Sequence, residues 1–310
     1  MEFRVLGRPE VCQDGECLDS GTLKQRTVLA ALLLSANEPL STARLVDSVW
    51  WDPPAAAGSN LRMYLSGLRR LLRVPGEQGS RLRTPWTGVY ELTVLPGELD
   101  LDRFYGLADR GGRELRDGRP RAAADSFEQA LRLWRGRALD GLACGPGLQT
   151  KVMLVEERRL AVAEQWAHAW LDLGRPERVV PELRALVKEH PLRERLWGCL
   201  ILALCRSGRP GEALAAYAEL RGVLAAELGT DPGPELRRLH ERILRGDGSL
   251  ADARPVPADG PLSIDLLATG LRALADGCEA LGEHSAARHA RHAAGDLLRR
   301  TGEPSLALPG

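Results

Sequence analysis

Residues 59–73, SNLRMYLSGLRRLLR, decide the fold of the N-terminal part of this chain. Apolar residues recur there at steps of three and four, the spacing of one side of an α-helix. They are Leu61, Tyr64, Leu65, Leu68, Leu71 and Leu72. A polar stripe spans about 80° on the other side, at 100° per residue. It consists of Ser59, Arg62, Ser66, Arg69 and Arg73. The pattern predicts a helix with one face in the core and one basic face.

Two further helices are predicted just before this basic helix. Thr22 and Gln25 form a capping-box pattern, in which both side chains satisfy free backbone amides, and this helix continues to Asn37. Ser41 can cap a second helix over residues 42–50, and Pro53-Pro54 ends it. A loop from about residue 50 to residue 58 then leads into the basic helix.

Short β-strands are predicted on both sides of the three helices. Residues 3–6, 10–12 and 16–18 read as strands, and Asp14-Gly15 favours a tight hairpin turn. Residues 81–84 and 89–94 alternate around residues 85–88, which predicts a second hairpin with a protruding tip. This order of elements describes a winged helix-turn-helix, whose third helix enters the DNA major groove. A solvated, arginine-rich helix is the alternative for the third helix taken alone, and the order of elements favours DNA binding.

The charge is distributed unevenly along the chain. The 310 residues contain 42 Lys and Arg and 42 Asp and Glu, so the net charge indicates neither nucleic acid, an anionic membrane nor an acidic substrate. Between Arg62 and Arg83, however, there are six arginines and one glutamate. Arginine can donate two hydrogen bonds to guanine, so this segment has the right chemistry for a major groove.

Residues 97–245 have a helical pattern throughout. Three helices are predicted to begin after Gly-Arg-Pro turns at Gly118, Gly174 and Gly208. The last two glycines lie 34 residues apart, which is the tetratricopeptide period. An irregular stretch with Cys144-Gly145-Pro146-Gly147 interrupts the array, and the four tryptophans of this part are expected to fill its core. These are Trp134, Trp166, Trp170 and Trp197.

The sequence therefore predicts a mainly α protein with a small β component and four segments. Residues 1–96 form a winged helix-turn-helix, and residues 97–245 form a tetratricopeptide-like helical array. Residues 246–261 are rich in Gly and Pro and read as a flexible linker. Residues 262–310 read as a C-terminal helical hairpin whose apolar seam packs on the array or on another chain.

The polar residues that commonly build metal or catalytic sites are not grouped in a typical pattern. None of the six cysteines forms a Cys-x-x-Cys pair, so we expect buried free thiols and not a zinc or disulfide site. His284, His289 and His292 lack a Cys or carboxylate that would complete a metal set. Phosphate-binding, nucleophile-elbow and zinc-protease motifs are missing. We expect no enzyme activity, no metal and no cofactor.

No apolar run approaches the roughly 18 residues that span a membrane, and the first residues lack a signal peptide. We therefore expect a cytoplasmic protein that is associated with the nucleoid when bound to DNA, with no membrane partner.

Three stretches together resemble the Streptomyces antibiotic regulatory protein family. They are TLKQRTVLAALLLSANEPLSTARLVDSVW (22–50), SNLRMYLSGLRRLLR (59–73) and the run from HPLRERLW to DPGPELRRLHERIL (190–244). The resemblance covers about residues 1–245, and Cys205 stands where the family usually has Tyr. It implies an OmpR-type winged helix followed by a bacterial transcriptional activation domain of tetratricopeptide hairpins.

The resemblance also implies which residues contact DNA. On the third helix they are Asn60, Arg62, Ser66, Arg69, Arg70 and Arg73. On the wing they are Thr84, Trp86, Thr87, Gly88 and Tyr90, although TPWTGVYEL departs from the usual family turn. Lys24 and Arg26 would hold phosphate, which explains cations in a first helical turn where the helix dipole disfavours them.

The partners implied are double-stranded DNA with direct repeats upstream of secondary-metabolite promoters, bound as a dimer, and RNA polymerase holoenzyme with its sigma factor. Trp51 lies about 100° around from Trp50, which completes the apolar face of the second helix, so its ring is expected to be exposed. Trp51 and Asp52 are the candidate polymerase contacts, because this loop faces polymerase in OmpR-type activators. The alternative is that Trp51 packs on the repeat domain of its own chain.

A second class of function stays open from the sequence alone. A tetratricopeptide adaptor, whose winged helix binds protein and not DNA, would fit the near-zero net charge and the concave surfaces of repeat arrays. The salt dependence of DNA affinity distinguishes the two, because only phosphate neutralisation gives a steep slope.

Overall fold

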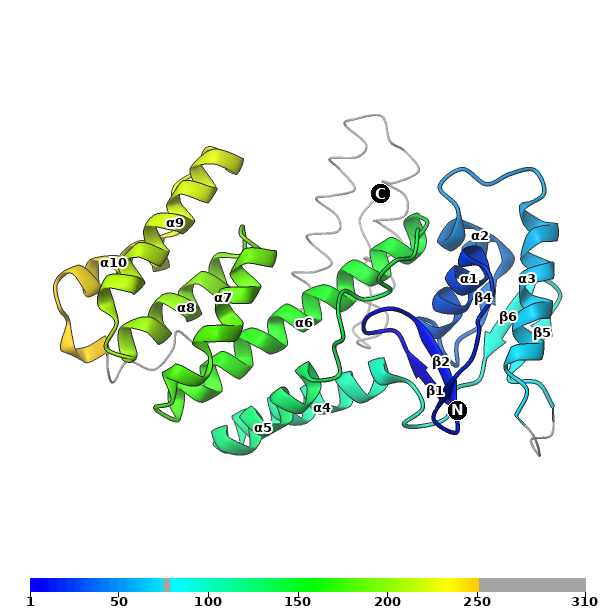
Figure 1. Ribbon diagram of the computed structural model, residues 1–310, viewed down its shortest axis with the longest axis horizontal. Coiled ribbons are helices and arrows are strands. Elements are labelled where there is room, and N and C mark those ends of the chain that lie inside the picture. The colour runs from blue at the N-terminus through cyan, green and yellow to red at the C-terminus, as the bar shows by residue number, and fades with distance from the viewer. Residues whose placement is uncertain (75–78, 251–310) are drawn as a thin grey trace, which may run out of the picture. The chain divides into compact units, whose positions relative to one another are not determined.

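A computed structural model describes residues 1–74 and 79–250 (Figure 1). The described chain forms two compact units. The first comprises Met1–Tyr105 and Arg132–Arg159, and the second comprises Gly106–Leu131 and residues 160–250. The sequence predicted one continuous domain on each side of residue 96, whereas each compact unit combines segments that are separate in the sequence. The segment 132–159 belongs with the winged helix, because its backbone amides donate to the loop at residues 5–7 and to Ser48.

The N-terminal sheet has three antiparallel strands in the order β1-β2-β3 (Figure 1). They are β1 (Glu2–Arg4), β2 (Glu10–Gln13) and β3 (Glu16–Cys17). Asp14 and Gly15 form the turn between β2 and β3 with φ angles of 52° and 88°. Both values are left-handed, as this two-residue hairpin requires, so the predicted turn is confirmed.

Cys12 and Cys17 form a disulfide, and the expectation of free thiols is wrong for these two residues. Gln13 and Glu16 pair on either side of the turn, so Cys12 and Cys17 are the next pair of the ladder. Directly opposed residues on neighbouring strands have close Cβ atoms. A hairpin with its turn at Asp14-Gly15 brings Cys12 and Cys17 opposite each other, so the pairing is local to the predicted hairpin. Cys144, Cys199 and Cys205 are free, and Cys278 lies outside the described residues.

Three helices follow: α1 (Leu23–Leu33), α2 (Thr42–Val49) and α3 (Ala57–Leu71). Thr22 and Ser41 cap the first two, and their side-chain oxygens accept from the backbone amides of Gln25 and Arg44. Helix α1 ends four residues before the predicted Asn37. Asn37 has a φ of 62°, and its side-chain amide pairs with the backbone of Val94, which ends the helical path.

The core of the winged helix is built from the predicted apolar faces. Leu61, Leu65 and Leu68 of α3 have no exposed surface, and Leu72 is 1% exposed. Trp50 is buried and stacks on Tyr64 with ring centroids 6.5 Å apart. The prediction that Trp50 belongs to the core is confirmed, and this packing fixes the orientation of α3.

The wing belongs to a second sheet with the order β4-β6-β5. Its strands are β4 (Leu40–Ser41), β5 (Leu82–Trp86) and β6 (Val89–Leu92). The β5–β6 register shifts between Arg83 and Trp86, around Pro85. A proline cannot donate to the ladder and is usually found at such irregular positions. The predicted hairpin and its tip are confirmed.

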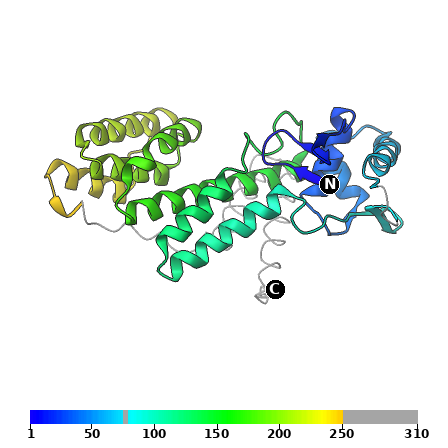
Figure 2. The same cartoon turned by 60° about the horizontal axis from the view of Figure 1, so that its bottom comes forward.

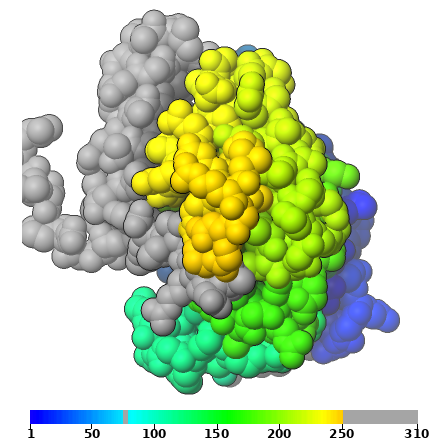
Figure 3. Space-filling model, turned by 90° about the vertical axis from the view of Figure 1, so that its left-hand side faces the viewer, coloured from blue at the N-terminus to red at the C-terminus, as the bar shows by residue number. Residues whose placement is uncertain are grey.

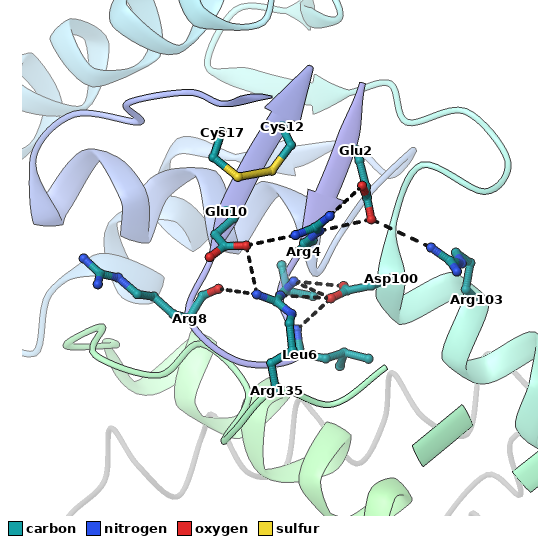
Figure 4. Close-up of polar contacts among 11 residues, drawn as sticks. Glu2, Arg4, Leu6, Arg8, Glu10, Cys12, Cys17, Asp100, Arg103 and Arg135 are labelled. Carbon is teal, nitrogen blue, oxygen red and sulfur yellow. Dashed lines mark hydrogen bonds and ion pairs between the residues drawn. A yellow bond between two sulfur atoms is a disulfide. The ribbon is translucent and has the colours of Figure 1, made fainter. Parts of the chain in front are cut away.

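A polar cluster holds the N-terminal sheet to the start of α4 (Asp100–Arg116) and to Arg135 (Figure 4). The Asp100 carboxylate accepts from the backbone amides of Val5 and Leu6 at 2.8–3.1 Å. The Arg135 guanidinium donates to Glu10 at 3.0 Å and to Asp100 at 3.4 Å. Burial raises the pKa of Asp100, while these hydrogen bonds and the charge of Arg135 oppose that rise. The cluster ties three distant parts of the first unit together.

The second unit is built of helices, with β-strands absent from its described residues (Figure 2). Its elements include parts of α4 and of α6 (Pro146–Asp172), then α5 (Pro120–Leu131), η1 (Pro176–Arg178), α7 (Val180–Glu189), α8 (Glu194–Arg206), α9 (Pro210–Leu228), α10 (Pro234–Leu244) and η2 (Gly248–Leu250). Figure 3 shows the surface formed by α9 and α10, in yellow to orange. The mainly α fold with a small β component is confirmed.

The Gly-Arg-Pro turns act as predicted. Gly118, Gly174 and Gly208 have φ angles of 66° to 72°, and each closes the preceding helix. The amides of each glycine and of the following arginine donate to carbonyls of that helix, and proline then opens the next helical segment. Left-handed glycine after a helix and proline at the first helical position are the favoured end and start signals.

The tryptophans of the repeat region fill its core as predicted: Trp166, Trp170 and Trp197 are 7%, 1% and 2% exposed. Trp134, in the first unit, is half-buried and packs edge-to-face on Phe104. In the predicted linker, Leu250 is buried and its carbonyl accepts from Arg206, so residues 248–250 are packed. The rest of that linker and the predicted hairpin 262–310 lie outside the described residues. Within the described chain, every helix is too short or too polar to cross a bilayer.

Candidate nucleic-acid interface

Helix α3 presents a basic face that is open to solvent. Arg62, Ser66 and Arg70 are exposed on it. Helix α3 ends at Leu71, two residues before the predicted end, so Arg73 is exposed just past the helix. Within residues 1–74 and 79–250, the guanidinium groups of Arg62, Arg70 and Arg73 have neither an ion-pair partner nor a side-chain hydrogen bond. Two uncompensated charges on α3 and a third just past its end produce a local positive potential that the zero net charge of the chain conceals.

Arg69 lies on the same face, but its guanidinium is used inside the domain. Its Nε donates to the carbonyl of Leu82 at 3.2 Å, and its Nη2 donates to Oγ1 of Thr84 at 2.6 Å. Both acceptors belong to β5, so Arg69 links α3 to the wing. Arg69 could read a base, as predicted, only by giving up its bonds to Leu82 and Thr84.

Asn60 and Tyr90 do not join this face. Asn60 lies about 160° around the helix from Arg62, at 100° per residue, on the same side as the half-buried Tyr64. Tyr90 is 9% exposed and pairs with Leu40 across the β4–β6 ladder. The structure places Tyr90 in the core of the first unit.

The tip of the wing is exposed and carries an aromatic residue. Trp86 is 65% exposed, and Thr84 and Thr87 are exposed beside it. Gly88 has a φ of 76°, and its carbonyl accepts from both the backbone amide and the hydroxyl of Thr42 at 2.8 and 2.9 Å. The start of α2 therefore holds the turn of the wing in place.

Met63 is a surface residue that the sequence analysis missed. It is 61% exposed on α3, about 100° from Arg62. The apolar stripe of α3 lies on the opposite side of the helix. At 100° per residue, Met63 falls outside that stripe and near the arginines, and this position could have been read from the sequence. An apolar side chain at that position can contact a thymine methyl group in a major groove.

Lys24 and Arg26 are half-buried at the start of α1. The ammonium of Lys24 donates to the carbonyl of Val49 at 2.7 Å and lies 5.6 Å from the ring centroid of Trp50. This internal acceptor at the end of α2 accounts for a cation in the first turn of α1. Arg26 lies 3.5 Å from the exposed carboxylate of Asp19.

Two of the six arginines counted between residues 62 and 83 are neutralised by acidic partners. Arg81 is buried and pairs with Glu98 at 2.6 Å, and Arg83 pairs with Glu91 at 2.7 Å. The positive surface is therefore concentrated on α3, and the base of the wing is electrically balanced.

Trp51 is exposed as predicted, with 69% of its surface open, and Asp52 is exposed next to it. The indole Nε1 of Trp51 donates to the carbonyl of Cys144 at 2.9 Å. Cys144 belongs to the segment that precedes α6 and lies in the same compact unit. The ring thus makes one contact with its own chain and leaves most of its surface free.

A winged helix with an exposed basic third helix, followed by helical repeats, defines the class of winged-helix regulators with an appended helical domain. Two family models match the chain in that order. The transcriptional regulatory protein C-terminal domain matches residues 20–92, and the bacterial transcriptional activator domain matches residues 99–244. The chain belongs to the Streptomyces antibiotic regulatory protein family of transcriptional regulators, which confirms the resemblance seen in the sequence.

Individual relatives support this assignment. The regulatory protein DnrI of Streptomyces peucetius is 36% identical over 272 residues, covering 85% of this chain and 100% of DnrI. The regulatory protein AfsR of Streptomyces coelicolor is 41% identical over 261 residues. That match covers 84% of this chain, which spans only 26% of the length of AfsR.

A solved structure of Mycobacterium tuberculosis EmbR, in complex with a low affinity phosphopeptide, has a TM-score of 0.71 and 31% identity to this chain. The match covers 97% of this chain and 70% of the EmbR chain.

Proposed function

We propose that this protein is a sequence-specific transcriptional activator that binds double-stranded DNA through α3 and the wing. The observation that carries the proposal is the exposed basic surface of α3 and its C-terminal end, where Arg62, Arg70 and Arg73 have no acidic partner among the described residues. Unpaired arginines suit the phosphates and guanine edges of DNA, which supply strong acceptors. A solvated face of a neutral domain has no need of such an arrangement.

In this proposal the residues of the interface have separate tasks. Arg62 and Ser66 read bases in the major groove, Arg70 and Arg73 lie toward the ends of the contact and bind phosphate, and Arg69 orients the wing. Thr84, Trp86, Thr87 and Gly88 bring the wing to the adjacent groove or backbone. Arg26 contacts phosphate near α1, and Lys24 does so only if its bond to Val49 is exchanged for one to DNA.

We infer from the family that two copies bind direct repeats near promoters of a secondary-metabolite gene cluster. One winged helix reads few base pairs, so useful specificity needs a second copy about one helical turn away. Inserting about five base pairs between the repeats turns one half-site to the opposite side of the duplex. Cooperative binding measured by footprinting should then be lost, and unchanged cooperativity would exclude the tandem arrangement.

DNA binding itself is tested by salt dependence. Each phosphate that the protein neutralises should steepen the slope of log affinity against log salt by about 0.9. We expect a steep slope on a footprinted operator, and a shallower one for Arg70→Ala and Arg73→Ala. A flat slope with wild-type protein would instead favour the adaptor function, in which the winged helix binds protein.

We further propose that the protein recruits RNA polymerase holoenzyme, including its sigma factor, through Trp51 and Asp52. An exposed tryptophan is a frequent centre of protein interfaces, and most of the Trp51 ring is open. Trp51→Ala should keep operator affinity and thermal stability while losing activation in a reconstituted transcription assay. A lower melting temperature with a proportionate loss of DNA binding would instead show that Trp51 stabilises the fold through its contact with Cys144.

A further inference from the structure

A pocket of about 400 Å³ lies in the first unit beside Trp51, and nothing in the proposed DNA contact uses it. Its other walls come from the segment between residues 137 and 152, including Arg137, Asp140, Leu142 and Val152. This volume lies within the range of small-molecule sites, which combine apolar walls with a few polar groups.

Trp51 forms one wall with its ring held in a fixed direction. The indole N–H is already satisfied by the carbonyl of Cys144 at 2.9 Å. The ring is nevertheless 69% exposed, so its aromatic surface is the part left for a partner. A flat ring anchored at its polar end is suited to stacking on another planar ring.

Arg137 and Asp140 bring one positive and one negative charge to the same pocket. Both side chains are exposed, and in the described part of the chain they form no ion pair with each other or with a third residue. The backbone that carries them is fixed to the N-terminal loop: the amide of Leu139 donates to Val5 at 3.0 Å, and that of Asp140 to Gly7 at 3.1 Å.

Leu139, which also lines the pocket, has a φ of 57°. A bulky residue other than glycine in this left-handed region is strained, and such strain concentrates at ligand sites and other functional positions. Leu139 is 2% exposed, so its burial offsets the strained backbone. Arg137 and Asp140 lie on either side of this strained residue, and both line the pocket.

We propose that this pocket binds a small zwitterion with an aromatic ring, of which an aromatic amino acid is the simplest form. The ring stacks on Trp51 and rests against Leu142 and Val152. The planar guanidinium of Arg137 pairs with the carboxylate of the ligand, and Asp140 pairs with its ammonium group. A pocket lined by one unpaired charge of each sign together with apolar side chains is complementary to a zwitterion with an apolar ring.

Isothermal titration calorimetry on the full chain, with three matched probes, tests this proposal. The probes are L-tryptophan, indole-3-propionate, which lacks the ammonium group, and tryptamine, which lacks the carboxylate. We expect saturable binding of L-tryptophan and affinities at least about tenfold lower for the other two, since each loses one charge pair. The titrations contain no DNA, so their outcome is independent of the proposed DNA binding.

Substitutions assign each charge to its partner. Arg137→Gln should weaken L-tryptophan about tenfold and leave tryptamine unchanged, while Asp140→Asn should do the same for L-tryptophan and leave indole-3-propionate unchanged. Arg238→Gln and Asp231→Asn are matched exposed controls in the second unit and should change nothing. Trp51→Ala should abolish binding of all three probes, with melting temperatures recorded to confirm folding.

The proposal fails if L-tryptophan shows no saturable binding at millimolar concentration. It also fails if folded Trp51→Ala, Arg137→Gln and Asp140→Asn proteins bind L-tryptophan as the wild type does, because the binding would then occur elsewhere. Equal affinity for all three probes would show that the ring alone is recognised, and the zwitterion would be excluded.

Discussion

The arginines at the end of the winged helix's third helix and those around the core of the helical repeats have different surroundings. On α3 and just past its end, Arg62, Arg70 and Arg73 face solvent with no acidic partner among the described residues. In the second unit, Arg193 pairs with the buried Glu164 at 2.9 Å, and Arg178 lies 4.1 Å from the ring centroid of Trp170 and 3.7 Å from Glu128. The same side chain is left open for a partner in one region and covers core residues in the other.

This difference shows why the composition of the chain was a poor guide to its partners. Arginine charges that are paired within the fold contribute little field at a distance, whereas unpaired charges on one helix add up. The balanced total of 42 basic and 42 acidic residues therefore coexists with a positive helix. The contrast predicts that substitutions in the repeats change stability and those on α3 change DNA affinity.

Trp170→Ala should give the largest effect of these substitutions. It should lower the stability of the protein and leave the DNA affinity of the folded protein unchanged. Trp170 is 1% exposed, and the guanidinium groups of Arg121 and Arg178 lie 4.9 and 4.1 Å from its ring centroid. Truncating a buried tryptophan costs about 3–5 kcal/mol of unfolding free energy. Urea unfolding monitored by circular dichroism measures the loss. A loss below about 1 kcal/mol would contradict the core role of this ring.

Arg62→Ala and Arg69→Ala should separate binding from structure on α3. Arg62→Ala should cost about 1–3 kcal/mol of operator affinity, relax the preference at one base pair and leave the melting temperature unchanged. Arg69→Ala should also lower the melting temperature, because it loses both bonds to β5. Fluorescence anisotropy with single-base operator variants, beside thermal melts, measures both effects. If both variants keep wild-type affinity and specificity, the exposed face of α3 is not the DNA-binding surface.

The repeats should lose stability in mild acid, because they contain a partly buried histidine, His168. Burial beside Cys199, with the charges of Arg195 and Arg206, lowers the pKa of His168 from 6.5 to about 4. The unfolded chain then binds more protons than the folded chain as pH falls from 6.5 to 4, so stability is lost in that window. At about 1.4 kcal/mol per pH unit, the loss reaches about 2 kcal/mol at pH 5.

The control for this pH effect is His168→Gln, which cannot take up the proton. We expect the urea midpoint of the second unit to fall less between pH 7 and pH 5 in this variant than in the wild type. An identical fall in both proteins would show that other groups cause the acid sensitivity.

Glu241→Gln should cause the smallest loss of stability among these substitutions in the repeats. Glu241 and Arg245 are 3.4 Å apart and highly exposed at the end of α10. Exposed pairs four residues apart on a helix contribute about 0.3–0.5 kcal/mol. Thermal melts at low and high salt should show a small difference that salt removes. A loss above about 1 kcal/mol would mean that even surface pairs of the repeats are structural.

Much of the fold followed from local signals that the structure confirms. Thr22 and Ser41 cap the helices that their sequence patterns predicted, and Asp14-Gly15 makes its hairpin turn. The end of α1 was misplaced because Asn37 is positioned by Val94, which lies 57 residues further along the chain. Local patterns do not contain such distant acceptors.

The candidate site divides in the same way. The shared exposed face of Arg62 and Ser66 could be read from the 100° rotation per residue, because a helical face depends only on spacing. Arg73 was predicted on the same stripe, but α3 ends at Leu71 and Arg73 lies past it. That Arg69 bonds to β5, that Tyr90 is buried and that Lys24 donates to Val49 depended on segments brought together by folding. The exposure of Trp51 was predicted, whereas its hydrogen bond to Cys144 was not.

The sequence by itself determined the helices, the hairpins and the glycine-proline punctuation of the repeats, because caps, turns and apolar periodicity act within a few residues. Only the tertiary structure decided which cations are neutralised and that residues 132–159 pack with the winged helix. These outcomes depend on side chains from separate elements coming within a few ångströms of one another, and that proximity is a property of the packed chain.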